Sequence, residues 1–328
     1  MLRFWHPVLA SDDLHRGKVR AVRIAGLPVA MFRTVEGRVS AIADQCAHRR
    51  MRLSEGKVEG DRLICPYHGW SYTAHGEGES PSTPRLHACV DSYDCEEASG
   101  AIWIRKRGAT ETLRPPSVEG MKFTGAVFST VRAPLELVID NFSEVEHTVE
   151  MHPDFGFGRD GAEEATAVLE TCDQSVTVRS HGPAKMPPFD TRLTGGIRRG
   201  DRFHSDFTFR FDPPLSTVRH YWVEARSERR RPIEYRLFHF FVPTDASTTT
   251  IVTFGFLSVN RALFRILDEP VAWLFRRKLE RTVEEDARIV ENLADPSPHL
   301  EGMKLGRFDA ILGLTRDRLA RIYYGTAD

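Results

Sequence analysis

Two short pairs of metal-binding side chains constrain this chain more than any other feature. Cys46 and His48 form the first pair, and Cys65 and His68 form the second after a gap of sixteen residues. Within each pair, one tight loop can present a thiol and an imidazole to the same site. Two thiols and two imidazoles suit either tetrahedral zinc or a two-iron cluster with unlike ends. The sequence therefore predicts a metal centre near the N-terminus, and the residue types alone leave both metals open.

The length of the chain and its charge balance narrow the class of protein. At 328 residues the chain exceeds the usual size of one domain, so we expect two domains, each with its own core. Lys and Arg number 45 against 46 Asp and Glu. This balance argues against broad electrostatic binding to nucleic acid or to an anionic membrane, and it favours a small-molecule substrate.

The other cysteines and the N-terminal residues bear on the cellular compartment. Cys89, Cys95 and Cys172 are too few for a secreted disulfide framework in a chain of this length. The first residues contain no apolar stretch typical of a signal peptide, and no window reaches the 18 or so apolar residues of a spanning helix. We therefore expect a cytoplasmic protein with no membrane association.

Short β-rich runs dominate residues 5–107. Examples are 19–24, 27–32, 39–42 and 101–104, with turn residues between them. They predict a small all-β domain that carries the four metal-binding side chains. Pro115 and Pro116 mark a linker, because successive prolines disfavour both helical and sheet hydrogen bonding. We place one domain over 1–112 and the second over 113–328.

Alternating apolar and polar residues characterise much of the second domain. The alternation covers several segments of about 166–258, including 202–211, 218–223 and 248–256, and it predicts an antiparallel sheet with one covered face. A helix is predicted near 133–151 and a longer one near 269–294. Together these elements predict an α+β domain in which helices close over one side of a curved sheet.

A segment that combines histidines with acids lies at the end of the first predicted helix. His147 and His152 are five residues apart, which on a straight helix separates them by about 140°, too wide for one metal ion. Pro153 disfavours helical geometry at His152, so we expect His152 to turn back from the following loop while His147 stays on the helix. The alternative is that both are ordinary polar residues at a helix end. A third ligand decides between the two interpretations.

The last predicted helix offers that ligand. Steps of four, three, four and three residues predict an inward stripe of Leu279, Val283, Asp286, Val290 and Leu293. Asp286 is its only charged member, and a carboxylate that faces a core is costly unless it is paired or bound to a metal. Glu284, Glu285 and Glu291 fall off the stripe, where solvated charge explains them. Two histidines and a carboxylate are the ligands of non-haem iron oxygenases, and an ion pair between Asp286 and an arginine of the sheet is the alternative.

The loops of the first metal site resemble those of Rieske [2Fe-2S] proteins. The Cys-x-His pair with its basic run, the gap of sixteen and the sequence Cys-Pro-Tyr-His-Gly-Trp all match that pattern, which favours iron over structural zinc. The resemblance implies that Cys46 and Cys65 hold one iron and that His48 and His68 hold the other, in a site that passes single electrons. Neither loop has the additional cysteine of respiratory Rieske proteins, which favours the lower-potential oxygenase or ferredoxin kind.

With both segments considered, the chain resembles the Rieske non-haem iron oxygenases, the ring-hydroxylating oxygenase α-subunit family. The resemblance implies an N-terminal all-β Rieske domain followed by a helix-grip catalytic domain. It implies a [2Fe-2S] cluster and a mononuclear iron(II) held by His147, His152 and Asp286, with O2 as cosubstrate. NAD(P)H is then used only indirectly, through a separate ferredoxin or flavin reductase.

The resemblance also implies a path for the electron between neighbouring subunits, from His68 through Glu144 to His147. Most of the family has aspartate where this chain has Glu144, so the length of the bridge differs here. Asn141 is expected near the iron. The alternative is that Asn141 and Glu144 form a helix-capping pair.

The short chain resembles the α-only type of this family, which implies a homotrimer that monooxygenates a small organic substrate by hydroxylation or oxidative demethylation. Aromatic, heterocyclic and N- or O-methyl compounds are the substrates considered. Arg49, Arg50 and Arg52 are expected either to dock an acidic ferredoxin or reductase or to form a solvated basic loop. The alternatives for function are a cis-dihydroxylating dioxygenase and an electron-transfer Rieske protein with a non-catalytic second domain.

Overall fold

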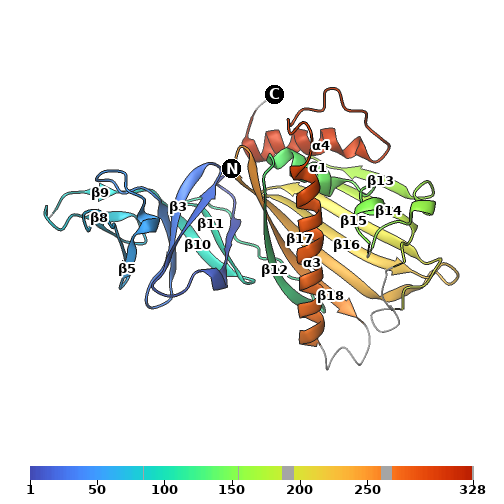
Figure 1. Cartoon of the computed structure of the whole chain (residues 1–328), viewed down its shortest axis with the longest axis horizontal. Coiled ribbons are helices and arrows are strands. Elements are labelled where there is room, and N and C mark those ends of the chain that lie inside the picture. Colours follow the sequence, from blue (N-terminus) through green and yellow to red (C-terminus); the bar gives the residue numbers. More distant parts are fainter. Residues whose placement is uncertain (84, 154, 187–195, 260–267, 327–328) are drawn as a thin grey trace. The chain divides into compact units, whose positions relative to one another are not determined.

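A computed structural model of the chain describes residues 1–83, 85–153, 155–186, 196–259 and 268–326. These residues form two compact units (Figure 1). The first unit comprises Met1–Pro115 with Val242–Ala246, and the second comprises Pro116–Phe241 and Ser247–Asp328. The fold class expected from the sequence, an all-β domain followed by an α+β domain, is confirmed.

The first unit is built from two antiparallel sheets. The larger sheet has the strand order β1-β11-β10-β4-β3-β2, formed by β1 (His6–Ala10), β2 (Val19–Ile24), β3 (Leu27–Arg33), β4 (Val39–Ala43), β10 (Ser92–Ala98) and β11 (Ala101–Lys106). Four of these strands begin at the residues predicted from their β-rich runs. Short 3₁₀ turns lie at Ser11–Asp13 and Leu53–Glu55.

The smaller sheet of the first unit adjoins both metal-binding loops. Its order is β5-β6-β7-β8-β9, formed by β5 (Lys57–Glu59), β6 (Arg62–Ile64), β7 (Ser71–Tyr72), β8 (Glu77–Glu79) and β9 (Ala88–Cys89). The loop of the first cysteine follows β4, and the loop of the second joins β6 to β7. Both cysteines belong to one hydrophobic cluster, with Ala30, Phe32, Ile42, Leu53, Leu63, Trp70, Tyr72 and Ala88. The site is therefore anchored in a packed core.

One seven-stranded antiparallel sheet forms the framework of the second unit. Its order is β12-β18-β17-β16-β15-β14-β13, formed by β12 (Lys122–Val131), β13 (Thr166–Thr171), β14 (Ser175–Pro183), β15 (Arg202–Phe211), β16 (Pro214–Val223), β17 (Arg230–Asp245) and β18 (Thr248–Val259). Buried and part-exposed residues alternate along β15 and β16, which confirms the predicted one-sided burial. β12 precedes the region in which strands were expected.

Helices cover the buried face of this sheet. They are α1 (Leu135–Ser143), α2 (Thr148–Met151), α3 (Asp268–Glu291) and α4 (Leu312–Arg318), with short turns at Arg159–Gly161, Asp309–Ile311 and Leu319–Tyr324. α3 runs lengthwise over β12 and β18, and α1 packs against α3 and α4 (Figure 1). Within the described residues, no helix is both long and apolar enough to cross a membrane.

The prediction of one helix over 133–151 is wrong. The helix stops at Ser143, because Glu144 has extended backbone angles of φ −122° and ψ 163°. The Glu144 carboxylate then accepts the backbone N–H groups of Glu146 and His147, so it caps the next turn instead of continuing the first helix. The chain regains helical geometry at His147 and forms the four-residue α2.

Candidate metal centres

The two cysteine loops of the first unit have the same backbone design. Cys46 donates its N–H to the carbonyl five residues later and accepts the N–H of Arg50 at 2.9 Å. Cys65 repeats this pattern and accepts the N–H of Gly69 at 3.2 Å. Arg50 and Gly69 both adopt left-handed angles, with φ of 57° and 70°. Two equivalent tight turns thus present one thiol and one imidazole each.

The four side chains divide into a buried and an exposed pair. The thiol residues Cys46 and Cys65 are 1 % and 3 % exposed, while His48 and His68 are exposed, with ring centroids 4.6 Å apart. The Tyr72 hydroxyl lies 3.1 Å from the Cys46 sulfur. Two buried thiols and two exposed imidazoles with adjacent rings fit the ligand set of a [2Fe-2S] cluster with unlike ends, in which the cysteines would hold one iron and the histidines the other.

The second unit brings together the three predicted ligands of a single metal ion. One ligand atom from each of His147, His152 and Asp286 lies within 4.8 Å of the others. The Asp286 Oδ1 atom is 3.7 Å from Nε2 of His147 and 3.3 Å from Nε2 of His152. His152 leaves the helix as expected, with φ −100° and ψ 110°. The chemistry and spacing of this donor set fit iron(II) with open positions.

Neighbouring polar groups hold each of these three side chains in place. Nδ1 of His147 lies 2.5 Å from a Glu144 carboxylate oxygen, and Nδ1 of His152 lies 3.2 Å from one of Glu285. The Asn141 amide donates to Asp286 at 3.2 Å. A ligand histidine held through its other nitrogen is fixed in tautomer and orientation. Asn141 and Glu144 do not form the alternative capping pair, because Asn141 lies inside α1 and donates to Asp286, while Glu144 caps the following turn by itself.

Burial and charge distinguish this cluster from an ordinary ion pair. Asp286 is 4 % exposed, and no lysine or arginine of the described segments pairs with it. Burial opposes a positive charge on His147, but the carboxylates of Glu144 and Asp286 outweigh it and raise the pKa of this imidazole. The site thus carries an excess of negative charge that a divalent cation balances. The predicted alternative of an arginine partner for Asp286 is not formed.

A pocket adjoins the three ligands on the side of the sheet. Its apolar lining includes Phe142, Phe155, Phe207, Val218, Leu237 and Leu279, and its polar lining includes Ser205, His220 and His239. The free volume is about 70 Å³. That is roughly half of a cavity that holds benzene. A ring-sized substrate therefore requires lining side chains to move.

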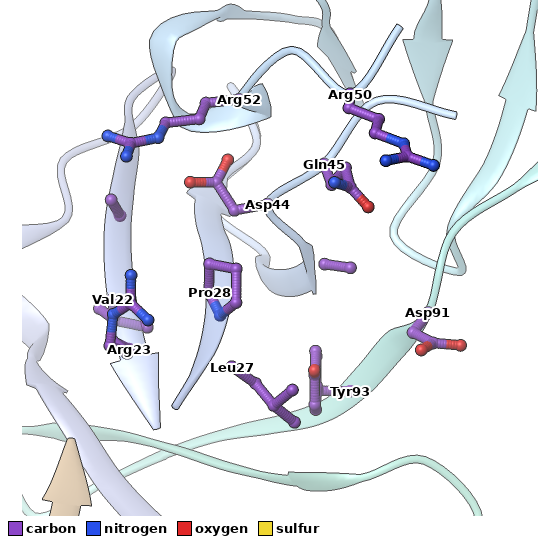
Figure 2. Close-up of a pocket in the computed structure, with 12 residues that line it drawn as sticks. Val22, Arg23, Leu27, Pro28, Asp44, Gln45, Arg50, Arg52, Asp91 and Tyr93 are labelled. Carbon is purple, nitrogen blue, oxygen red and sulfur yellow. The ribbon is translucent and has the colours of Figure 1, made fainter. Parts of the chain in front are cut away.

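Beside the first cysteine loop, the first unit has an arginine-lined hollow of about 630 Å³. Figure 2 shows Arg23 and Arg52 on one side of it and Arg50 on the other, with Asp44 and Pro28 between them. Arg50 and Arg52 belong to the loop that begins at Cys46. Within the described residues, no carboxylate forms an ion pair with these three arginines. The nearby Asp44 carboxylate instead accepts hydrogen bonds from the backbone N–H and the hydroxyl of Ser54, both at 2.7 Å.

Comparison with known protein families agrees with both centres. A Rieske [2Fe-2S] domain model matches residues 4–94, and a model of the vanillate O-demethylase oxygenase C-terminal domain matches residues 131–320. The second match covers more than half of the chain. The chain belongs to the Rieske non-haem iron oxygenases.

Individual curated relatives match this Rieske oxygenase over about half of its length. Methylxanthine N1-demethylase NdmA of Pseudomonas putida is 32 % identical over 184 residues, 49 % of this chain and 50 % of the relative. The vanillate O-demethylase oxygenase subunit of a Pseudomonas species is 27 % identical over 195 residues, 56 % of this chain and 54 % of that protein. The chain thus spans about half the length of these curated relatives.

Solved structures share the fold of the Rieske oxygenase over almost its whole length. Dicamba monooxygenase bound to 3,6-dichlorosalicylic acid superposes with a TM-score of 0.80 at 18 % identity and covers 98 % of this chain and 97 % of that one. Pseudomonas putida NdmA with caffeine superposes with a TM-score of 0.67 at 22 % identity, covering 98 % and 91 %. At these identities the likeness concerns the fold.

Several residues around the iron-binding cluster of this Rieske oxygenase were not predicted from its sequence. Glu285 was interpreted as solvated charge, yet it contacts His152. Ser205, His220 and His239 stood within β-rich runs with no motif around them. Lys185 lies 33 residues from His152 and contacts its carbonyl oxygen. The one available signal was the position of Glu285 next to the inward Asp286.

Proposed function

We propose that this chain is the oxygenase component of a Rieske-type system, which hydroxylates or oxidatively demethylates a small organic substrate with O2. The observation that carries the proposal is the cluster of His147, His152 and Asp286 beside an apolar pocket. Three ligands leave further coordination positions open for O2 and substrate. When bound, the [2Fe-2S] cluster supplies single electrons and iron(II) supplies the activation of O2.

In this proposal the chain's own residues orient the metal ligands and keep water out of the substrate pocket. Glu144 and Glu285 keep the two imidazoles in the orientation and tautomer that direct Nε2 to the metal. Phe142, Phe155 and Leu279 keep the reacting end of the substrate dry, which limits side reactions of a strong oxidant.

Electron delivery is proposed to cross between subunits of a homotrimer, from His68 of one subunit through Glu144 of the next to His147. The 2.5 Å contact of Glu144 with Nδ1 of His147 supports the second step, and the exposure of His68 supports the first. Glu144→Gln tests the path, because it removes the charge and keeps the length. We expect the cluster to remain reducible by dithionite while its reoxidation by O2 and substrate slows by at least tenfold, and an unchanged rate would contradict the path.

The electron donor is proposed to be an acidic ferredoxin or a flavin reductase that docks at the arginine-lined hollow. Unpaired arginines around an apolar floor match the usual anatomy of an interface with an acidic partner, and the hollow adjoins a cluster loop. Arg23→Glu and Arg52→Glu should raise KM for such a donor about tenfold and flatten its salt dependence. Arg38→Glu, an exposed arginine outside the hollow, serves as the control.

Metal analysis tests the proposed function independently of the substrate. Wild-type protein should contain one iron beyond the two of the cluster, and Asp286→Ala should lose that iron while it keeps the cluster absorption. Retention of iron and turnover in Asp286→Ala would contradict the proposal. A wild-type protein with the cluster iron alone would favour an electron carrier. Labelled O2 in the product distinguishes monooxygenation, with one atom incorporated, from cis-dihydroxylation, with two.

A further inference from the structure

Two polar side chains of the pocket face each other across neighbouring strands. Ser205 of β15 and His220 of β16 are direct partners in the antiparallel register, so their side chains lie on the same face of the sheet. Ser205 is 3 % exposed and His220 is 9 % exposed, and both line the pocket beside the metal-binding cluster. They form a polar pair inside the second unit.

The hydrogen-bonding capacity of this pair is unused. No hydrogen bond within the described part of the chain involves the Ser205 hydroxyl or the His220 ring nitrogens, which line the pocket, although the Ser205 backbone carbonyl accepts a hydrogen bond from Ser180. Buried polar groups are nearly always bonded, and leaving one without a partner costs about 1–3 kcal/mol. A pair left open toward a pocket is therefore expected to bond to what fills that pocket.

The surroundings of the pair are apolar. The next row of the same face consists of Phe207, Val218 and Leu237, and the Phe155 ring lies 5.4 Å from the His220 ring. Among the described residues that line the pocket there is no lysine or arginine. The ligand must therefore have a largely apolar body, with a polar group at the position of the pair.

The chemistry of the pair restricts the polar group that it binds. Burial lowers the pKa of His220 to about 3, so the imidazole is neutral and offers one donor and one acceptor. The Ser205 hydroxyl also donates and accepts. With one N–H and one O–H donated side by side, the pair matches an oxygen with two lone pairs, as in a carbonyl group or a carboxylate.

We infer that Ser205 and His220 form a subsite for an oxygen atom of the substrate, which is a largely apolar ring compound that carries a carbonyl or carboxylate group. This inference rests on the proposed function, because it assumes that the pocket beside the metal-binding cluster receives the substrate. It adds the substrate class and the two residues that select it.

Binding of three matched fragments to the resting holoprotein tests the subsite without turnover. The probes are meta-methoxytoluene, meta-methoxybenzamide and meta-methoxybenzoate, titrated at up to millimolar concentration by calorimetry. They share the methoxy ring and differ in the group offered to the pair. The variants are Ser205→Ala and His220→Phe. Ser216→Ala is the control, because Ser216 is a buried serine of β16 outside the pocket lining.

We expect the amide or the carboxylate to bind at least tenfold more tightly than methoxytoluene, and each variant of the pair to remove most of that preference, about 1.4 kcal/mol. A preference for the amide indicates a carbonyl substrate, and a preference for the benzoate indicates a carboxylate. Equal binding of all three, no binding of any, or an unchanged preference in both variants would overturn the inference. Iron content, measured in the same samples, separates this failure from a failure of the proposed function.

Discussion

The ammonium group of Lys185 lies 2.8 Å from the backbone carbonyl oxygen of His152. The same nitrogen also donates to the carbonyls of Thr148 and Val149, at 2.9 and 2.6 Å. These carbonyls belong to the short α2 and to the residue that follows it, where a helix leaves carbonyl groups without internal partners. A cation at this end also complements the helix dipole. Lys185 therefore fixes the backbone between the two histidine ligands.

Replacing Lys185 should weaken metal binding without removing a ligand. In Lys185→Met the carbonyls lose their donor, so His147 and His152 are no longer held at one separation. We expect the dissociation constant for Fe(II) or Co(II) at this site to rise about 10–100-fold, as for other residues that orient metal ligands. Titration of the apo site with either metal measures the change. Lys304→Met, at an exposed lysine, should leave the affinity unaltered.

The role of Glu285 can be tested against a matched control, because the preceding residue of α3 is also a glutamate. Glu285→Gln keeps the size of the side chain but removes the charge that accepts from Nδ1 of His152. We expect weaker metal binding of the same order, about tenfold or more. Glu284→Gln changes an exposed carboxylate one residue earlier on α3. Equal affinities in the two variants would show that Glu285 does not orient the histidine.

Local sequence patterns predicted the parts of both centres that depend on short spacings. The stripe of Leu279, Val283, Asp286 and Val290 is buried on α3 as its period required, whereas Leu293 lies beyond the end of the helix and is 43 % exposed. The paired cysteine and histidine spacings similarly identified one compact site. Both predictions concern residues whose mutual positions follow from a few backbone angles.

Contacts across the fold could not be predicted in the same way. Glu144 ends α1 through its own side chain, which competes with the helix for backbone N–H groups. The helical periodicity of the sequence does not indicate that competition. The contacts of Lys185 with α2 and the pairing of Ser205 with His220 depend on which strands and helices become neighbours. These contacts can be identified only from the tertiary structure.

Tyr72 should raise the reduction potential of the [2Fe-2S] cluster. Its hydroxyl accepts the N–H of Ala47 at 3.0 Å, so its own proton is available to the Cys46 sulfur. A hydrogen bond to a sulfur ligand favours the reduced cluster, which carries one more negative charge. At about 1 kcal/mol for one bond, Tyr72→Phe should lower the potential by about 40 mV in a spectroelectrochemical titration. Tyr93→Phe changes a tyrosine of the same unit whose contact with a thiol is made by its backbone carbonyl to Cys95, so it should leave the potential unchanged.

His6 makes the stability of the first unit depend on pH. The residue is fully buried, and burial lowers the pKa of His6 from its ordinary value of 6.5 to about 4. Between these two values the unfolded chain binds a proton that the folded chain does not, so stability is full above about pH 6.5 and falls as the pH decreases toward 4. The difference of about two and a half pKa units corresponds to about 3 kcal/mol.

His6→Gln should therefore flatten the acid side of the stability profile. Denaturant unfolding of wild type and variant at several values between about pH 7 and pH 5 measures the difference, and loss of the cluster on unfolding affects both proteins alike. His15→Gln is the control, because His15 is an exposed histidine of the same unit. We expect the gap in unfolding free energy between wild type and His6→Gln to narrow steadily as the pH falls. A gap that stays constant over this range would show that His6 takes up no proton on unfolding.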